Sequence, residues 1–209
     1  MTTPAPASTL VFVGDSITDA GRDRGDAGSL GDGFVSLVAD ELGRGEASVR
    51  VVNVGIAGNR AVDLAGRWEQ DVAPHGADVL TIFVGVNDMW RRFDQDDPTS
   101  AEAFEATYRS LIADSGGAGA LILMEPFFLP VRAEQRAWLD DLDPKRDVVR
   151  RIAAEANAAL VPLHDLMSAA ADREGVAAIA PDGVHPTARG SRVIADAWLA
   201  AYDSLARRD

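Results

Sequence analysis

Short apolar runs alternate along the chain with longer segments in which apolar side chains return every three or four positions. The short runs are almost continuously apolar, and most of them are followed quickly by glycine or proline. Strands of this composition are typical of a parallel sheet that is buried on both faces. The pattern predicts five such strands, at residues 10–13, 49–54, 79–84, 120–124 and 159–163.

The longer segments have the spacing of helices that pack one face against a sheet. Their apolar stripes begin at Phe34, Ala61, Phe104, Val148 and Val193. Regular alternation of strands and helices favours right-handed crossovers, with helices on both faces of the sheet. The sequence therefore predicts an α/β fold, a three-layer α/β/α sandwich around a parallel sheet of about five strands.

The length of 209 residues suits one sizeable domain better than two small ones. We expect that domain to cover residues 9–209 and residues 1–8, which are rich in proline, threonine and serine, to form a flexible tail. The first residues have neither the basic region nor the apolar core of a signal peptide, and no apolar run is long enough for a bilayer. We therefore expect a soluble, cytoplasmic protein.

The net charge of the chain limits the kinds of partner that it can bind. The formal net charge is −13, from 33 acidic and 20 basic residues. A negative field of this size repels phosphate backbones and anionic lipid surfaces, so neither nucleic acid nor a membrane is an expected partner.

Cysteine and histidine usage limits the chemistry further. The chain has no cysteine, which excludes disulfides, thiolate metal sites and a cysteine nucleophile. The three histidines, His75, His164 and His185, lie too far apart in the sequence to form a local metal motif. We expect neither a metal nor a cofactor.

Polar residues and glycines gather where the predicted strands end. Ser16 follows the first strand in the motif GDS, Gly58 follows the second, and Asn87 follows the third. A loop near the C-terminus adds Asp182 and His185, three positions apart. Because sites in such sheets form at the carboxyl ends of the strands, we expect these segments to meet on one rim.

Ser16 on its own allows three interpretations: a helix cap, part of a phosphate-binding loop, or a nucleophile. Serine is a good helix cap, as is the preceding Asp15. Phosphate-binding loops carry the pattern GxxxxGK[ST] or GxGxxG, and this segment has neither. A nucleophilic serine needs a base such as neutral imidazole, and the imidazole needs a carboxylate to orient it. His185 and Asp182 supply both on one tight loop.

An ester hydrolase also needs donors for the oxyanion of its tetrahedral intermediate. The backbone N–H of Ser16, an N–H in the glycine turn at Gly58, and the side-chain amide of Asn87 are of suitable types. We expect the neighbouring Asp15 and Asp88 to hold loop backbone rather than to act as catalytic acids.

These motifs together resemble those of the SGNH (GDSL-type) hydrolases. The segments GDSI, GIAGN, GVND and DGVH stand in the order of that family, from residue 14 to residue 185. The chain is most similar to the acetylxylan-esterase-like branch of the family. The segments that carry this similarity are LGDGFV (30–35), GNRAVDLAGRW (58–68), GVNDMWR (85–91), MEPF (124–127) and DGVHPT (182–187).

The resemblance implies a flavodoxin-like sheet and the removal of small acyl groups, acetyl above all, from sugars without a metal. It makes Ser16 the nucleophile, His185 the general base and Asp182 its orienting partner. It makes Gly58 and Asn87, with the N–H of Ser16, the oxyanion hole. An acetylated sugar such as a xylo-oligosaccharide is the substrate it implies, and it allows a homo-oligomer.

Three further residues near the strand ends are candidate substrate contacts. Trp90 and Arg91 follow the asparagine motif and can flank the acyl pocket or bind sugar. The alternatives are core packing for Trp90 and a surface ion pair for Arg91. Phe127 lies after the fourth strand, where an aromatic ring can stack on a sugar or cover the core.

Two other functions remain open at this point. One is a hydrolase of the same family that acts on lysophospholipids or thioesters. The other is a flavodoxin-like module that binds a ligand without catalysis. A preference for acetyl over octanoyl groups would favour a sugar deacetylase over a lysophospholipase or thioesterase. A module that only binds a ligand should not be labelled at Ser16 by a fluorophosphonate, whereas a serine hydrolase should.

Overall fold

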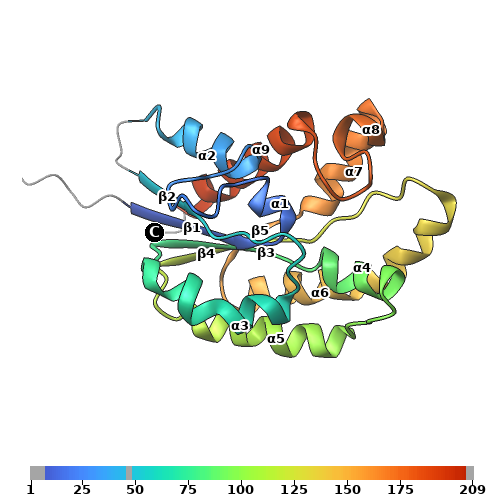
Figure 1. Cartoon of the computed structure of the whole chain (residues 1–209), viewed down its shortest axis with the longest axis horizontal. Helices are drawn as coiled ribbons and strands as arrows, with labels where there is room; N and C mark the ends of the chain where they lie inside the picture. Colours follow the sequence, from blue (N-terminus) through green and yellow to red (C-terminus); the bar gives the residue numbers. More distant parts are fainter. Residues whose placement is uncertain (1–7, 46–48, 206–209) are drawn as a thin grey trace, which may run out of the picture.

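The structure of the protein is a computed structural model that describes residues 8–45 and 49–205. In this part of the chain, a five-stranded parallel sheet lies between two layers of helices (Figure 1). The strand order is β2-β1-β3-β4-β5, the flavodoxin-like order, so the predicted fold is confirmed. The strands are β1 (Ser8–Gly14), β2 (Val49–Asn53), β3 (Val79–Phe83), β4 (Ala120–Met124) and β5 (Ala159–Val161).

Most strand boundaries agree with the sequence pattern, and β4 agrees at both ends. The last strand was predicted too long, because β5 ends at Val161 and a helix begins at Leu163. Pro162 lies between them, and a proline has no N–H to continue a ladder. The tail predicted over residues 1–8 lies outside the described residues except for Ser8, which already belongs to β1. The single domain over residues 9–209 stays a prediction.

Helices α2, α7 and α9 cover one face of the sheet, and α3, α5 and α6 cover the other (Figure 1). Short α1 and the longer α4 lie where the strands end. Within the part of the chain described, no helix is long and apolar enough to cross a membrane. The helices are α1 (Ser16–Asp19), α2 (Phe34–Leu42), α3 (Ala61–Asp71), α4 (Val86–Asp94), α5 (Ala101–Asp114), α6 (Leu139–Glu155), α7 (Leu163–Glu174), α8 (Val176–Ile179) and α9 (Ala188–Leu205), with 3-10 turns at Ala73–His75 and Ala133–Trp138.

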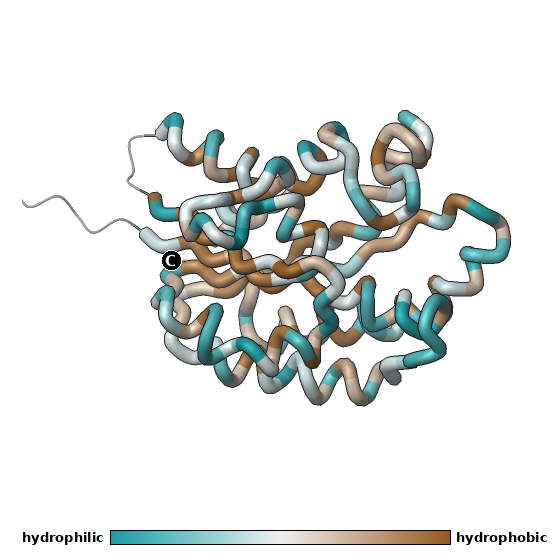
Figure 2. Tube along the Cα trace, viewed as in Figure 1, coloured by the Kyte–Doolittle hydropathy of each residue, from teal (hydrophilic) through white to brown (hydrophobic). Residues whose placement is uncertain are grey.

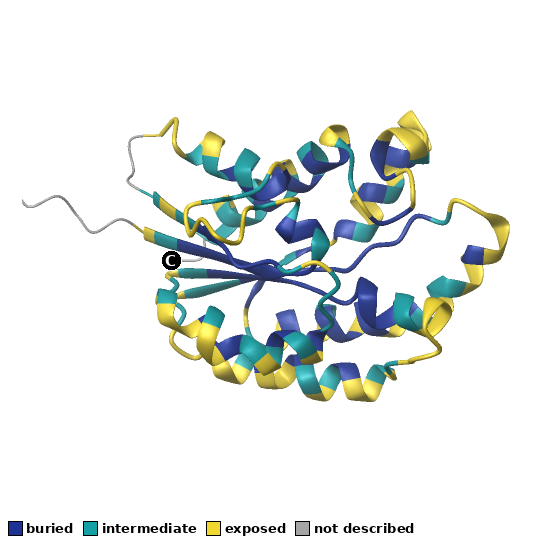
Figure 3. Ribbon diagram, in the orientation of Figure 1, coloured by how far each residue is buried: buried dark blue, intermediate teal, exposed yellow. Residues whose placement is uncertain are grey.

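The continuous apolar character of β1 follows from burial on both of its faces. Leu10 and Phe12 enter the core under α2 and α9, whereas Val11 and Val13 enter the core over α3 and α5. The ring of Phe12 lies 5.0 Å from that of Trp198 in α9. Figures 2 and 3 show the same arrangement, with apolar, buried strands at the centre and polar, exposed helix faces outside.

The strand register brings four strand ends to one level. Gly14 pairs with Phe83, Phe83 with Met124, and Met124 with Val161. The segments that follow β1, β3, β4 and β5 therefore leave the sheet along one rim. This rim carries the polar residues that the sequence analysis singled out.

Candidate active site

Ser16 lies at a sharp turn from strand to helix. Asp15 follows β1 and caps α1, its carboxylate accepting the N–H of Ile17 over 3.0 Å. Ser16 is the first residue of α1, so its hydroxyl projects from the rim of the sheet. Asp15 is almost fully buried, and burial raises the pKa of its carboxyl to about 7. Asp15 thus holds the turn from behind, as expected.

The hydroxyl of Ser16 is the first member of a hydrogen-bonded series. Its Oγ lies 2.9 Å from Nε2 of His185, and Nδ1 of His185 lies 2.6 Å from Oδ2 of Asp182. The two nitrogens of one ring thus connect a hydroxyl with a carboxylate. This is the geometry by which an imidazole can take a proton from a serine while a carboxylate fixes its tautomer.

The loop that carries Asp182 and His185 holds itself in shape. The other carboxylate oxygen of Asp182 accepts the backbone N–H groups of Val184 and His185, over 2.9 and 2.8 Å. Partial burial acts to raise the pKa of Asp182, but the hydrogen bonds from the His185 ring and the two N–H groups lower it below its usual value. Asp182 is therefore a carboxylate at neutral pH and can stabilise a protonated His185.

Gly58 and Asn87 present donors at the neighbouring strand ends. Gly58 has a φ of +84°, in a turn closed by the N–H of Asn59 and the carbonyl of Ile56 over 3.2 Å. None of the described residues accepts a hydrogen bond from the backbone N–H of Gly58. The buried side chain of Asn87 donates through Nδ2 to the carbonyl of Asn59 over 3.0 Å, which leaves its second N–H for another acceptor.

Asn87 belongs to the first turn of α4, a helix that the apolar pattern did not predict. The chain passes directly from β3 into this helix through Gly85, whose φ is +134°. A Cβ at Gly85 would lie 3.0 Å from the ring of Pro126, so this turn requires glycine. Asp88, which follows Asn87, is buried and accepts the N–H of Ala61 over 3.1 Å, which ties α4 to the start of α3. Burial raises the pKa of Asp88 to about 6.

Comparisons with known proteins identify the family of the chain. The family model of the GDSL-like lipases and acylhydrolases matches residues 12–193. The chain belongs to this family. The prediction of an SGNH (GDSL-type) hydrolase is therefore confirmed, and the protein is a carboxylic-ester hydrolase. This excludes the non-catalytic binding module.

Two of the similar proteins are esterases that act on acetylated xylan or xylo-oligosaccharides. The chain is 37% identical over 201 residues to an acetylxylan esterase of Geobacillus stearothermophilus, with 91% of each chain covered. Among solved structures it is similar to a mutant of Axe2, an acetyl-xylooligosaccharide esterase from Geobacillus (TM-score 0.86, 36% identity, 94% of this chain and 95% of that one). It is equally similar to LAE5, an α/β hydrolase from the metagenome of Lake Arreo, Spain (TM-score 0.86, 36% identity, 94% and 95%).

The three candidate substrate contacts differ in accessibility. The Trp90 ring lies 6.1 Å from that of His185, and Nη2 of Arg91 lies 3.9 Å from the position of a Cβ on Gly58. Arg91 also forms an ion pair with Asp94. Phe127, in contrast, is fully buried, so it lies in the core and is not available to a substrate. The sequence could not distinguish Phe127 from Trp90, because both are aromatic residues that follow a predicted strand by a few positions.

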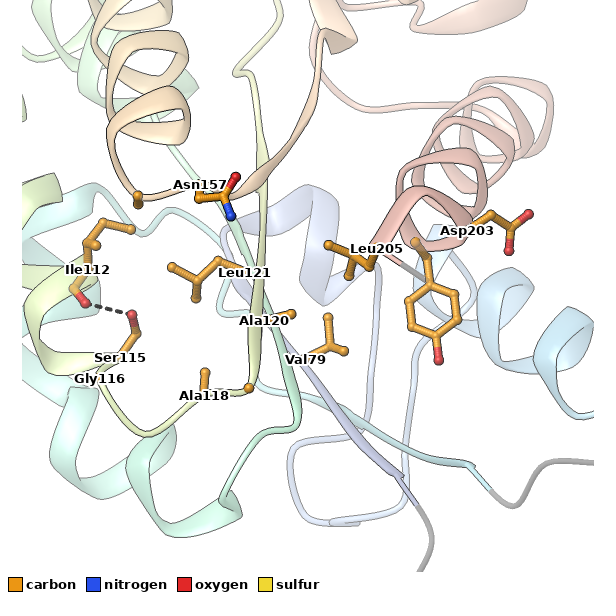
Figure 4. Close-up of a pocket in the computed structure, with 13 residues that line it drawn as sticks. Val79, Ile112, Ser115, Gly116, Ala118, Ala120, Leu121, Asn157, Asp203 and Leu205 are labelled. Atoms are coloured by element: carbon orange, nitrogen blue, oxygen red, sulfur yellow. Dashed lines mark hydrogen bonds between the residues drawn. The ribbon is translucent and has the colours of Figure 1, made fainter. Parts of the chain in front are cut away.

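A small pocket of about 260 Å³ opens beside Ser16 and His185. Its walls include the small residues Ala20, Gly33 and Ala188 and the acidic residue Asp32. A larger cavity of about 590 Å³ lies at the opposite, amino end of β3 and β4 (Figure 4). The hydroxyl of Ser115 in that cavity donates to the carbonyl of Ile112 over 2.7 Å. The described residues that line it include no histidine, arginine or lysine.

Sequence reasoning missed Asn53, a buried residue that connects three segments of the rim. Its amide donates to the carbonyls of Thr18 and Leu30 over 2.7 and 2.9 Å, and its oxygen accepts the N–H of Gly55 over 2.9 Å. The signal was present, because Asn53 and Arg50 are the two polar residues in the otherwise apolar run 49–54.

In the described ranges, no group of three or more histidine or acidic side chains could hold a metal ion.

Proposed function

We propose that the protein is a serine esterase that removes short acyl groups, acetyl foremost, from carbohydrates such as acetylated xylo-oligosaccharides. The observation that carries this proposal is the hydrogen-bonded series of Ser16, His185 and Asp182 beside a small pocket. The sugar ester as substrate is supported by the similarity to an acetylxylan esterase and an acetyl-xylooligosaccharide esterase.

In the first step, Oγ of Ser16 attacks the ester carbonyl while Nε2 of His185 takes the hydroxyl proton. Asp182 stabilises the imidazolium that forms. The oxyanion accepts the N–H groups of Ser16 and Gly58 and the amide of Asn87. When the intermediate collapses, His185 gives its proton to the departing sugar oxygen, and the acyl group stays on Ser16.

In the second step, a water molecule replaces the sugar alcohol. His185 takes a proton from this water as it attacks the acyl carbon, and the same three donors hold the second oxyanion. Collapse of this intermediate breaks the bond to Ser16, whose oxygen recovers the proton from His185. The products are a carboxylic acid and the free enzyme.

Trp90 and Arg91 are proposed to contact the sugar. Trp90 lies beside His185, where the leaving oxygen takes its proton, and an indole face suits stacking on a sugar ring. Arg91 lies beside Gly58, and its guanidinium can donate to sugar hydroxyls. Replacing Trp90 by alanine should raise KM for a sugar ester more than KM for a small aryl acetate.

The cytoplasmic location and a homo-oligomer stay predictions.

The first test is acetate release from an acetylated xylo-oligosaccharide, comparing the protein with its Ser16→Ala variant. Fast release that disappears in the variant would support both the nucleophile and the sugar ester. Equal release by both proteins would refute the mechanism. Release from neither would remove the sugar assignment, and short aryl esters would then test the esterase chemistry alone.

The acyl group is tested separately, with 4-nitrophenyl acetate and octanoate. The walls of Ala20, Gly33 and Ala188 enclose a small volume, so kcat/KM for acetate should exceed that for octanoate. A preference for octanoate, or for lysophospholipids or acyl thioesters, would favour the lysophospholipase or thioesterase alternative.

A further inference from the structure

The guanidinium of Arg67 lies behind the loops that carry the proposed oxyanion donors. Arg67 belongs to α3, and its side chain is only 13% exposed. Two of its hydrogen bonds leave the helix: Nε donates to Oδ1 of Asn59 over 2.7 Å, and Nη2 donates to the carbonyl of Gly14 over 3.4 Å. The third bond stays within α3, from Nη1 to the carboxylate of Asp71 over 3.1 Å.

Each outward bond reaches a segment that carries a proposed catalytic group. Gly14 ends β1 and precedes Ser16 by two positions. Asn59 follows Gly58, and its own carbonyl accepts the amide of Asn87 over 3.0 Å. One guanidinium therefore connects the strand end that leads to the nucleophile with the turn on which both neighbouring donors depend.

We propose that Arg67 is a positioning residue for the oxyanion site. It acts through Asn59, whose placement fixes the Gly58 N–H and, through the Asn59 carbonyl, the plane of the Asn87 amide. A carbonyl can only accept, so the NH₂ group of Asn87 faces Asn59, and the direction of its second N–H is determined by that bond. The inference rests on the proposed function, because it concerns the oxyanion of that reaction.

The contacts of Arg67 exceed what helix stability requires. An i, i+4 ion pair such as Arg67–Asp71 contributes roughly 0.2–0.5 kcal/mol to a helix and works on an exposed surface. Burial of a guanidinium against two neutral oxygens adds a desolvation cost that such a pair does not need. The planar fork of arginine reaches all three acceptors at once, whereas the single ammonium of a lysine cannot span them.

The test is a set of variants assayed with 4-nitrophenyl acetate, which needs no sugar contact. The variants are Arg67→Met, Arg67→Lys, Asn59→Ala, Asn87→Ala and the double variant Arg67→Met/Asn87→Ala. Asp71→Asn is the matched control, because it removes the ion pair and leaves the bonds from Arg67 to Asn59 and Gly14. Titration with a fluorophosphonate counts active enzyme, so that kcat refers to folded protein, and the thermal unfolding midpoint is recorded for each variant.

If the proposal holds, Arg67→Met lowers kcat by about 10–100-fold, part of the value of one oxyanion donor, with little change in KM. Asn59→Ala shows a similar loss, Arg67→Lys recovers only part of kcat, and Asp71→Asn keeps kcat near the wild-type value. In the Asn87→Ala background, the further loss from Arg67→Met is several-fold smaller than the loss in wild type, since only its effect on the Gly58 N–H then remains.

Three results would overturn the inference. These are a kcat within about threefold of wild type in Arg67→Met, a full multiplicative loss in the double variant, or an equal loss in Asp71→Asn. If Arg67→Met does not fold, Arg67→Lys and Asn59→Ala decide by the same criteria. Failure of the proposed function looks different, because wild type and Ser16→Ala would then hydrolyse the ester at equal rates.

Discussion

Oγ of Ser16 lies 2.9 Å from Nε2 of His185, although 169 positions separate the two residues. The parallel sheet contributes to this approach, because β1 ends level with β3, β4 and β5. The loop after β4 contributes as well: the N–H of Leu129 donates to the carbonyl of Gly183 over 2.9 Å and holds the histidine loop against the rim. Changes that displace the histidine loop should therefore lower kcat even where they leave Ser16, His185 and Asp182 in place.

Replacing His185 by alanine should lower kcat by roughly 10³–10⁶, because it removes the base that takes the Ser16 proton. Asp182→Asn should lower it by roughly 10³–10⁴, since the amide can favour the wrong tautomer of the ring. Steady-state hydrolysis of an aryl acetate measures kcat for both variants. A variant of either residue that kept more than a tenth of the wild-type kcat would contradict the series as the source of the proton transfer.

Replacing Asn87 by alanine should lower kcat by about 10²–10³, the value of one oxyanion donor, while KM changes little. The amide acts on charge that develops only in the transition state, so substrate binding is spared. Kinetics across a range of ester concentrations separate the two parameters. A loss confined to KM would instead place Asn87 among the substrate contacts.

The sequence was most informative where one residue type serves one physical purpose. Continuous apolar runs identified all five strands, and the motif order identified Ser16, Asp182 and His185, which the structure brings within hydrogen-bonding distance. Helix α4 was missed because it is mostly polar and buries only its first turn, where Asn87 lies. Phe127 was misplaced because an aromatic residue after a strand can face either solvent or core.

Arg67 shows the other limit of sequence reasoning. Its position within α3 fits any exposed helix face, and nothing in the local pattern distinguishes it from the many arginines in surface ion pairs. Its role depends on contacts with Gly14 and Asn59, which lie 53 and 8 positions away in the chain. Such long-range polar contacts become visible only once the fold is known.

Two glycines with nearly equal, positive φ angles offer a matched test of the histidine loop. Gly183 has a φ of +90° and Gly175 a φ of +89°, so alanine is strained at both, by about 1–3 kcal/mol. A Cβ at Gly183 would also lie 2.3 Å from the carbonyl oxygen of Leu129, whereas a Cβ at Gly175 meets nothing within 4 Å. Only the first substitution must displace the loop.

Gly175→Ala should therefore reduce the free energy of unfolding and leave kcat unchanged. Gly183→Ala should in addition lower kcat by about 10²-fold, because a shift of roughly 1 Å in a catalytic group has effects of that size. Denaturant unfolding and ester hydrolysis, measured on both variants, separate the two effects. Equal kcat values in the two variants would show that the loop tolerates the displacement.

The buried Asp15 should make folding stability fall as pH rises. Burial raises the pKa of its carboxyl from 3.8 to about 7. Below pH 3.8 the carboxyl is protonated in both the folded and the unfolded chain. Between 3.8 and about 7 the unfolded chain loses this proton while the folded protein keeps it, so stability decreases; above that range the loss is constant. The full loss amounts to roughly 4 kcal/mol.

Asp15→Asn removes this titration and can keep the acceptor for the N–H of Ile17 through its side-chain oxygen. Burial also raises the pKa of Asp88, to about 6, so Asp88 lowers the stability in the same direction as pH rises. The charge of His185 acts on Asp15 as well. The stabilities of wild type and Asp15→Asn are therefore compared with each other at each pH. Urea unfolding at pH 4, 6 and 8 should show the variant gaining stability relative to wild type as pH rises. A difference that stays constant across the series would mean that Asp15 is ionised in the folded protein throughout, with its charge compensated by neighbours.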